Sequence, residues 1–164
     1  MRDRRAPEAW FRDRAALALI GRRYLAWLAA LSLGWEIVQL PLYTIWDHPN
    51  AGYIAYAVLH CTVGDVLIGL ASLLAALLAT RAGTIGQWNH AAVMWVLIGL
   101  GVSYTAYSEW ANTVLRASWT YSALMPTIRI AGVELGLSPL LQWAVVPPVA
   151  LWLARRSHRQ PEIT

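Results

Sequence analysis

The sequence has few charged residues and almost no cysteine. Only 13% of its 164 residues are charged, whereas 58% are hydrophobic, and this composition excludes an ordinary soluble domain. Cys61 is the single cysteine, which excludes an internal disulfide and any CxxC redox or zinc motif. Lysine is absent, so all 13 basic residues are arginine, a bias that favours a GC-rich bacterial gene.

The familiar sequence motifs of catalysis are also missing. There is no P-loop, no GxGxxG, no HExxH and no Ser-His-Asp order. No basic stripe alternates with aromatic residues, so we expect no nucleic-acid partner. The four histidines are scattered along the chain, and His60 has no second histidine at a similar depth to form a bis-histidine haem site. The sequence therefore identifies neither a cofactor nor a reaction.

What the chain has instead is long apolar runs. A helix rises about 1.5 Å per residue, so about 20 apolar residues cross the hydrocarbon core of a bilayer. The runs predict an all-α integral membrane protein, a four-transmembrane-helix bundle that forms a single domain over residues 24–154. The predicted spans are residues 24–43, 53–80, 90–107 and 139–154.

Three segments lie outside these spans. Residues 1–23 mix seven arginines with large apolar side chains and predict an amphipathic helix on the cytoplasmic membrane surface. Residues 109–125 are too polar to cross and rich in aromatic residues, which predicts an interfacial helix between the third and fourth spans, ending near Pro126. Residues 155–164 form a polar tail.

The arginines also predict the orientation. Ten of them lie before the first span or after the fourth, whereas the segments on the opposite side hold only Arg116 and Arg129. Because positive residues concentrate on the cytoplasmic side, we expect both termini there, in a bacterial inner membrane. The bilayer is then the first expected partner.

Glu36 stands out in the first span because an ionisable group at membrane depth is a candidate functional residue. It shares one helical face with Ser32, Gln39 and Tyr43, which follow one another at intervals of three or four residues.

The second span holds two ionisable residues, His60 and Asp65, which point about 140° apart on a helix. We expect His60 to face a cavity that it shares with Glu36. Asp65 lies on a stripe of small and polar residues that includes Cys61 and Gly69, so we expect it to contact a neighbouring helix or to belong to a separate proton path.

The depths of these residues in their spans predict one polar cavity that opens to the outside. Its candidate catalytic residues are Glu36, His60 and Glu109, which are also the ligands we expect if a metal is bound. The candidate ligand-binding residues are Gln39, Tyr43, Tyr104, Asn112 and Gln142.

Three functions remain open from the sequence. The first is a membrane-embedded enzyme or binding protein for a lipid-like or amphiphilic molecule, using buried carboxylates and a histidine. The second is a non-catalytic accessory subunit of a larger membrane complex, in which the polar residues hold helices together. The third is an oligomeric transport subunit in which Glu36 and Asp65 carry protons or cations.

Overall fold

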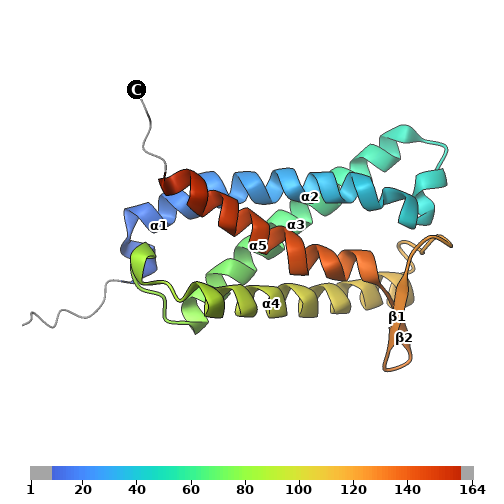
Figure 1. Cartoon of the computed structure of the whole chain (residues 1–164). Helices are drawn as coiled ribbons and strands as arrows, with labels where there is room; N and C mark the ends of the chain where they lie inside the picture. The colour runs from blue at the N-terminus through green and yellow to red at the C-terminus, as the bar shows by residue number, and fades with distance from the viewer. Residues whose placement is uncertain (1–8, 160–164) are drawn as a thin grey trace, which may run out of the picture.

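The structure, a computed structural model, describes residues 9–159. It is an elongated bundle of four long helices, with both described ends of the chain at one end and a small β-hairpin at the other (Figure 1). We call these the arginine end and the hairpin end. The predicted amphipathic segment and polar tail lie partly outside the described residues, at 1–8 and 160–164.

All four long helices are long and apolar enough to cross a membrane, which confirms the predicted bundle. Each predicted span coincides with one of them, although most run on further than predicted. The first is continuous over Arg14–Leu42 and is built from successive α, π and 3-10 segments. The elements are α1 (Arg14–Ala18), a π segment (Leu19–Tyr24), α2 (Leu25–Gln39), α3 (Ala51–Ala79), α4 (His90–Trp110) with a π turn (Ala111–Leu115), and α5 (Leu137–Arg159).

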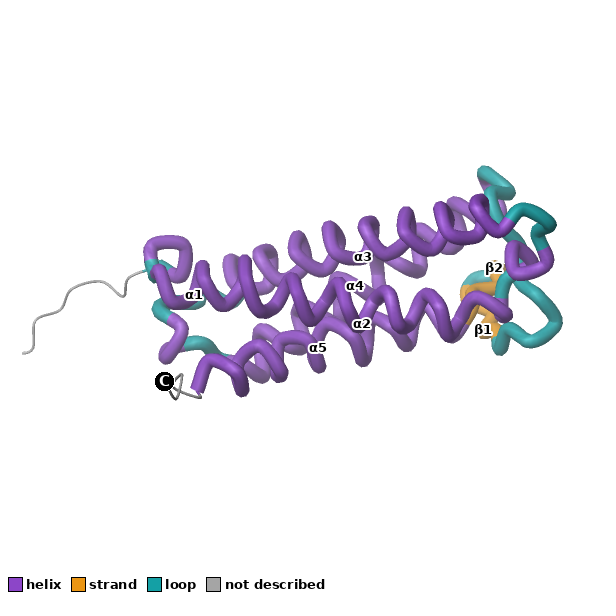
Figure 2. The backbone as a smooth tube through the Cα atoms, turned by 90° about the horizontal axis from the view of Figure 1, so that it is seen from above, coloured by secondary structure: helices purple, strands orange, loops and turns teal. Residues whose placement is uncertain are grey.

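The helices form a four-sided bundle. α2 packs against α3 and α5, and α4 packs against the same two helices, so α3 and α5 lie on opposite corners (Figures 1 and 2). Small residues allow the close contacts. The Tyr24 hydroxyl donates to the Gly69 carbonyl oxygen over 3.1 Å, and Leu28 fills the space beside Gly69 that a Cβ would occupy. The ring of Trp143 lies against Gly101 in the same way.

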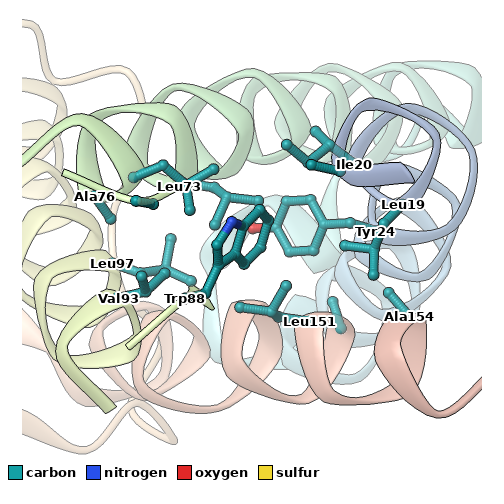
Figure 3. Close-up of a cluster of buried hydrophobic side chains, with 14 of the residues drawn as sticks. Leu19, Ile20, Tyr24, Leu73, Ala76, Trp88, Val93, Leu97, Leu151 and Ala154 are labelled. Carbon is teal, nitrogen blue, oxygen red and sulfur yellow. The ribbon is translucent and has the colours of Figure 1, made fainter. Parts of the chain in front are cut away.

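The apolar core fills the arginine end of the bundle. Leu73, Leu97 and Leu151 meet there from three helices, and Trp88 closes the core from the loop before α4 (Figure 3). The indole N–H of Trp88 donates to the Gly83 carbonyl oxygen over 3.0 Å, so this large ring is buried with its donor satisfied. The polar candidate residues lie toward the hairpin end.

The start of the first helix differs from the expected surface helix that ends at residue 23. The helix has no break there, and Leu19, Ile20 and Tyr24 are buried in the core. These residues follow one another at helical intervals and pack against α5, which explains why they continue the bundle.

The prediction of an interfacial helix over residues 109–125 is wrong for most of its length. The third helix continues to Leu115, and the chain from 116 to 126 is not helical. A β-hairpin follows, with β1 (Thr127–Ile130) antiparallel to β2 (Val133–Gly136). Ala131 and Gly132 have φ of 49° and 81°. Two successive positive φ angles make the tight turn whose twist suits a two-residue hairpin loop.

Candidate functional site

A chain of hydrogen bonds begins on one face of α2 near the hairpin end. Glu36 and Gln39 are three residues apart, so their side chains meet, and Gln39 Nε2 donates to Glu36 Oε1 over 2.7 Å. Ser138, near the start of α5, donates its hydroxyl to Gln39 Oε1 over 2.9 Å. Both sides of the Gln39 amide are thus used, and its orientation is fixed.

A second chain of contacts crosses the bundle. Gln142 lies one turn after Ser138 on α5 and is 3% exposed. Its Nε2 donates to Asp65 Oδ2 on α3 over 2.6 Å. Because α3 and α5 occupy opposite corners, this bond passes through the middle of the bundle.

These two sets of hydrogen bonds meet at Glu36 and Asp65, which we call the carboxyl pair. Glu36 lies close enough to Asp65 and Gln142 to be influenced by both. The groups that act on the pair are one another and the amides of Gln39 and Gln142, and none of them is basic. Two ionised carboxylates close to each other repel, and one shared proton removes that repulsion. We call these five residues the polar layer: Glu36, Gln39, Asp65, Ser138 and Gln142.

Glu109 belongs to a separate group, which lies closer to the hairpin than the polar layer does and which we call the upper group. It is 5% exposed, and the Tyr121 hydroxyl donates to Glu109 Oε2 over 2.5 Å. The backbone N–H of Gly136 donates to the same tyrosine oxygen over 2.9 Å. The rings of Tyr43 and Trp119 cover this site, with Tyr43 5.7 Å from Tyr121 and 6.5 Å from Trp119 between ring centroids.

The two tyrosines of this group stay neutral. Burial raises the pKa of Tyr121 above its ordinary value, and its hydrogen bond to Glu109 raises it further. Burial also raises the pKa of Tyr43, and the negative charges of Glu109 and Glu36 add to the effect. Because Tyr43 is influenced by both carboxyl groups, it connects the upper group to the polar layer.

Residues 118–126, which we call the strap, close this end of the bundle. The strap is bonded to the chain just after α2, through Thr44 N to Thr120 O at 3.0 Å and Ser122 N to Leu42 O at 2.9 Å. The Ser122 hydroxyl also donates to the Pro41 carbonyl oxygen over 2.8 Å. These bonds hold Tyr121 in place over Glu109.

The predicted site residues divide into two sets. The structure brings Glu36, Gln39 and Gln142 together, with Tyr43 and Glu109 next to them. Three others lie elsewhere: Tyr104 is 47% exposed, Asn112 donates to the Ser108 carbonyl oxygen of its own helix over 2.9 Å, and His60 is exposed.

The expected placements of His60 and Asp65 are wrong in one respect. His60 stacks on Tyr56 at 5.6 Å on the exposed side of α3 and does not share a cavity with Glu36. Asp65 does contact a neighbouring helix, as expected, but this contact also places it beside Glu36. The five-residue spacing separates the two side chains on α3 as expected, but Asp65 is the one that faces the bundle and His60 faces outward.

Two contributors were missed. Ser138 is absent from the predicted set, although Ser138 and Gln142 are four residues apart and therefore share a face. Tyr121 lies in the segment that was expected to form an interfacial helix, and no local pattern shows that it reaches Glu109.

A metal site made of Glu36, His60 and Glu109 does not form, because His60 faces away from the two acids. Within residues 9–159, no group of three histidine, cysteine or acidic side chains is arranged to hold a metal ion.

Fold and site together define the class of this protein. It is a bundle of four helices able to cross a membrane, with three acidic side chains inside it near one end. Comparisons with family models, with curated proteins and with solved structures found no match. The function must therefore be inferred from the site.

Proposed function

We propose that this chain is a membrane-embedded acid–base protein that receives a lipid-like or amphiphilic molecule at the hairpin end and exchanges a proton with it through the carboxyl pair. The observation that supports the proposal is the position of Glu36 beside Asp65. The two acids come from different helices, act on each other electrostatically, and have no basic partner among the groups that act on them.

The polar layer suits both directions of proton exchange. With the shared proton in place, the pair is a general acid. After the proton leaves, Gln39 Nε2 and Gln142 Nε2 still donate to Glu36 and Asp65, and these donors stabilise the ionised carboxylates. The pair is then a general base, and its geometry changes little because each amide is already fixed.

The upper group supplies the polar contacts for a headgroup. Tyr43 and Tyr121 remain neutral phenols, so each can donate to or accept from an oxygen of the bound molecule. In this proposal Glu36 and Asp65 are the acid–base residues, Glu109 joins them as a third acid, and Gln39, Gln142 and Tyr43 contact the ligand.

We further propose that the arginine end faces the cytoplasm of a bacterial cell. Four arginines lie before the start of α2 and one follows the end of α3, as the positive-inside rule requires: Arg12, Arg14, Arg22, Arg23 and Arg81. The hairpin and the strap then face outward, and a ligand reaches the carboxyl pair from the outer leaflet.

A non-catalytic accessory subunit is the second candidate. It is favoured by the exposed face of α3, where Tyr56 and His60 stack on the outside of the bundle. Another membrane subunit that covered these side chains would explain their exposure. Purification of the chain as a stable lone monomer would contradict this alternative.

The acid–base proposal is tested by Glu36→Gln and Asp65→Asn, which keep size and hydrogen-bonding capacity. In purified protein at neutral pH, infrared spectroscopy should show a protonated carboxyl band in the wild type that is reduced in both variants. Asp47→Asn, in the exposed turn after α2, is the control and should leave the band unchanged. Mass spectrometry of the same samples should find a co-purified amphiphile that both site variants lose. An identical carboxyl band in all four proteins would overturn the proposal.

A further inference from the structure

A second surface, at the opposite end from the carboxyl pair, has the composition of a lipid site. A depression of about 270 Å³ lies between the 3-10 turn Trp10–Arg12, the last turns of α3 and the loop that follows. Its walls are mostly apolar, including Phe11 and Leu78, which are 51% and 61% exposed. The charged side chain in its lining is Arg81.

Arg81 occupies an unusual backbone position. It follows α3 with φ of 50°, a left-handed conformation that glycine adopts with less strain. The backbone there ends the helix normally, because Arg81 N donates to the Leu78 carbonyl oxygen and Ala82 N donates to the Leu77 carbonyl oxygen. The turn could therefore be formed by glycine at this position. What arginine adds there is its side chain.

Two further groups favour an anionic ligand with an apolar body. The Arg12 guanidinium lies 6.0 Å from the centre of the Phe11 ring, so a second positive charge adjoins the depression. Trp10 also lines it and is 9% exposed. Positive charge and exposed apolar side chains therefore lie together where α3 emerges from the predicted membrane.

We infer that this depression binds an anionic phospholipid of the surrounding leaflet, with its phosphate at Arg81 and an acyl chain along Leu78 and Phe11. A negatively charged headgroup pairs with arginine through charge-assisted hydrogen bonds. The volume admits a phosphate and glycerol group, and the chains extend over the exposed apolar side chains into the bilayer. This site is separate from the carboxyl pair and does not depend on the function proposed for it.

The test compares binding of phosphatidylglycerol and phosphatidylcholine to the full chain by native mass spectrometry. The wild type should bind phosphatidylglycerol more tightly. Arg81→Gly removes the guanidinium and relieves the left-handed strain, so it should fold at least as stably while its phosphatidylglycerol Kd rises about tenfold. Arg22→Gln removes an exposed arginine of the same end that does not line the depression, and its Kd should change less than about twofold.

Each of the other results would overturn the inference. Equal affinity for the two lipids would show that charge is not recognised. Equal weakening in Arg81→Gly and Arg22→Gln would show that the arginines act only through their summed charge. Unchanged binding in an Arg81→Gly variant that folds like the wild type would show that the lipid is held elsewhere.

Discussion

Gln142 connects the polar layer across the bundle. Its amide donates to Asp65 on the opposite corner of the bundle, and it also acts on Glu36, the other member of the carboxyl pair. A buried carboxyl group that loses its donor keeps the full penalty of its desolvation. The position of Asp65 therefore depends on a residue 77 positions away in the sequence.

Gln142→Leu should destabilise the protein because it removes that donor and keeps the side-chain size. The expected loss is about 1–3 kcal/mol in the free energy of unfolding, measured by denaturant titration in detergent. The double variant Gln142→Leu with Asp65→Leu should recover part of this loss, because both polar partners are then absent. If the two single changes simply add, the bond contributes no coupling and its assignment is wrong.

Gly101 and Gly99 offer a matched pair in α4. A Cβ at Gly101 would enter the ring of Trp143, whereas a Cβ at Gly99 meets nothing within 4 Å. Gly101→Ala should therefore lower the unfolding free energy by about 1–3 kcal/mol, and Gly99→Ala should raise it by up to about 1 kcal/mol because alanine favours a helix. Thermal unfolding in detergent distinguishes the two, and equal effects would contradict the packing of α4 on α5.

At the scale of elements, the strap is the feature that shapes the site. It has no regular secondary structure, yet its bonds to residues 41–44 hold it across the end of the bundle, and Tyr121 reaches from it to Glu109. A short irregular segment thus places a side chain that the four helices alone do not supply.

Stability should fall at alkaline pH because of the tyrosines in this region. The pKa of Tyr121 and that of Tyr43 are raised in the fold from an ordinary value of 10.0. The folded state therefore holds these protons more tightly than the unfolded state does. Their contribution is complete below about pH 10 and declines as the pH rises above it, when unfolded tyrosine ionises first.

Tyr121→Phe should weaken this dependence. The variant loses the hydrogen bonds to Glu109 and from Gly136, so it should be less stable than the wild type at neutral pH by about 1–2 kcal/mol. Its melting temperature should then fall less steeply above about pH 10, because one of the two shifted groups is gone. Tyr107→Phe, at an exposed residue of α4, is the control. Parallel pH curves for wild type and Tyr121→Phe would rule out this role.

The positions of the helices could be predicted from the sequence, but the hairpin could not. The spans were predictable because hydropathy over some 20 residues depends on no tertiary contact. The grouping of Glu36, Gln39 and Tyr43 followed from helical spacing on one segment. The hairpin over residues 127–136 was not predicted, because its turn at Ala131 and Gly132 lacks the usual Asn-Gly signal.

The inward direction of a helix could not be predicted in the same way. The face with His60 and the face with Asp65 both carried polar residues, and a helix in a bilayer has no hydrophobic reason to bury either one. The face that α3 turns inward depends on contacts with other helices. Gln142 donates to Asp65, and Leu28 and Tyr24 pack against Gly69 one turn further along the same face.

At the scale of the whole molecule, the two ends differ in character. The arginine end holds the large apolar core and the proposed lipid site, and the hairpin end holds the buried Glu109 and the half-buried Glu36 and Asp65. The orientation proposed above follows from this difference together with the positions of the arginines.

Labelling of single cysteines tests the orientation. In a Cys61→Ser background, Asp47→Cys at the hairpin end should react with a membrane-impermeant maleimide in intact cells. Gly86→Cys, in the exposed loop between α3 and α4 with open space around it, should react only after the membrane is permeabilised. The reverse pattern would place the termini outside and contradict the proposed approach from the outer leaflet.

The two prolines inside α5 have a mechanical consequence. Pro147 and Pro148 lack backbone N–H groups, so the carbonyl oxygens of Trp143 and Ala144 have no helical donor. The part of α5 that carries Ser138 and Gln142 is therefore joined to the rest of the helix through its weakest turn. A bend at this turn would withdraw Gln142 from Asp65 and Ser138 from Gln39 while the apolar end of the bundle stayed packed. The least costly opening of the site is thus a hinge within one helix, and no whole helix needs to slide.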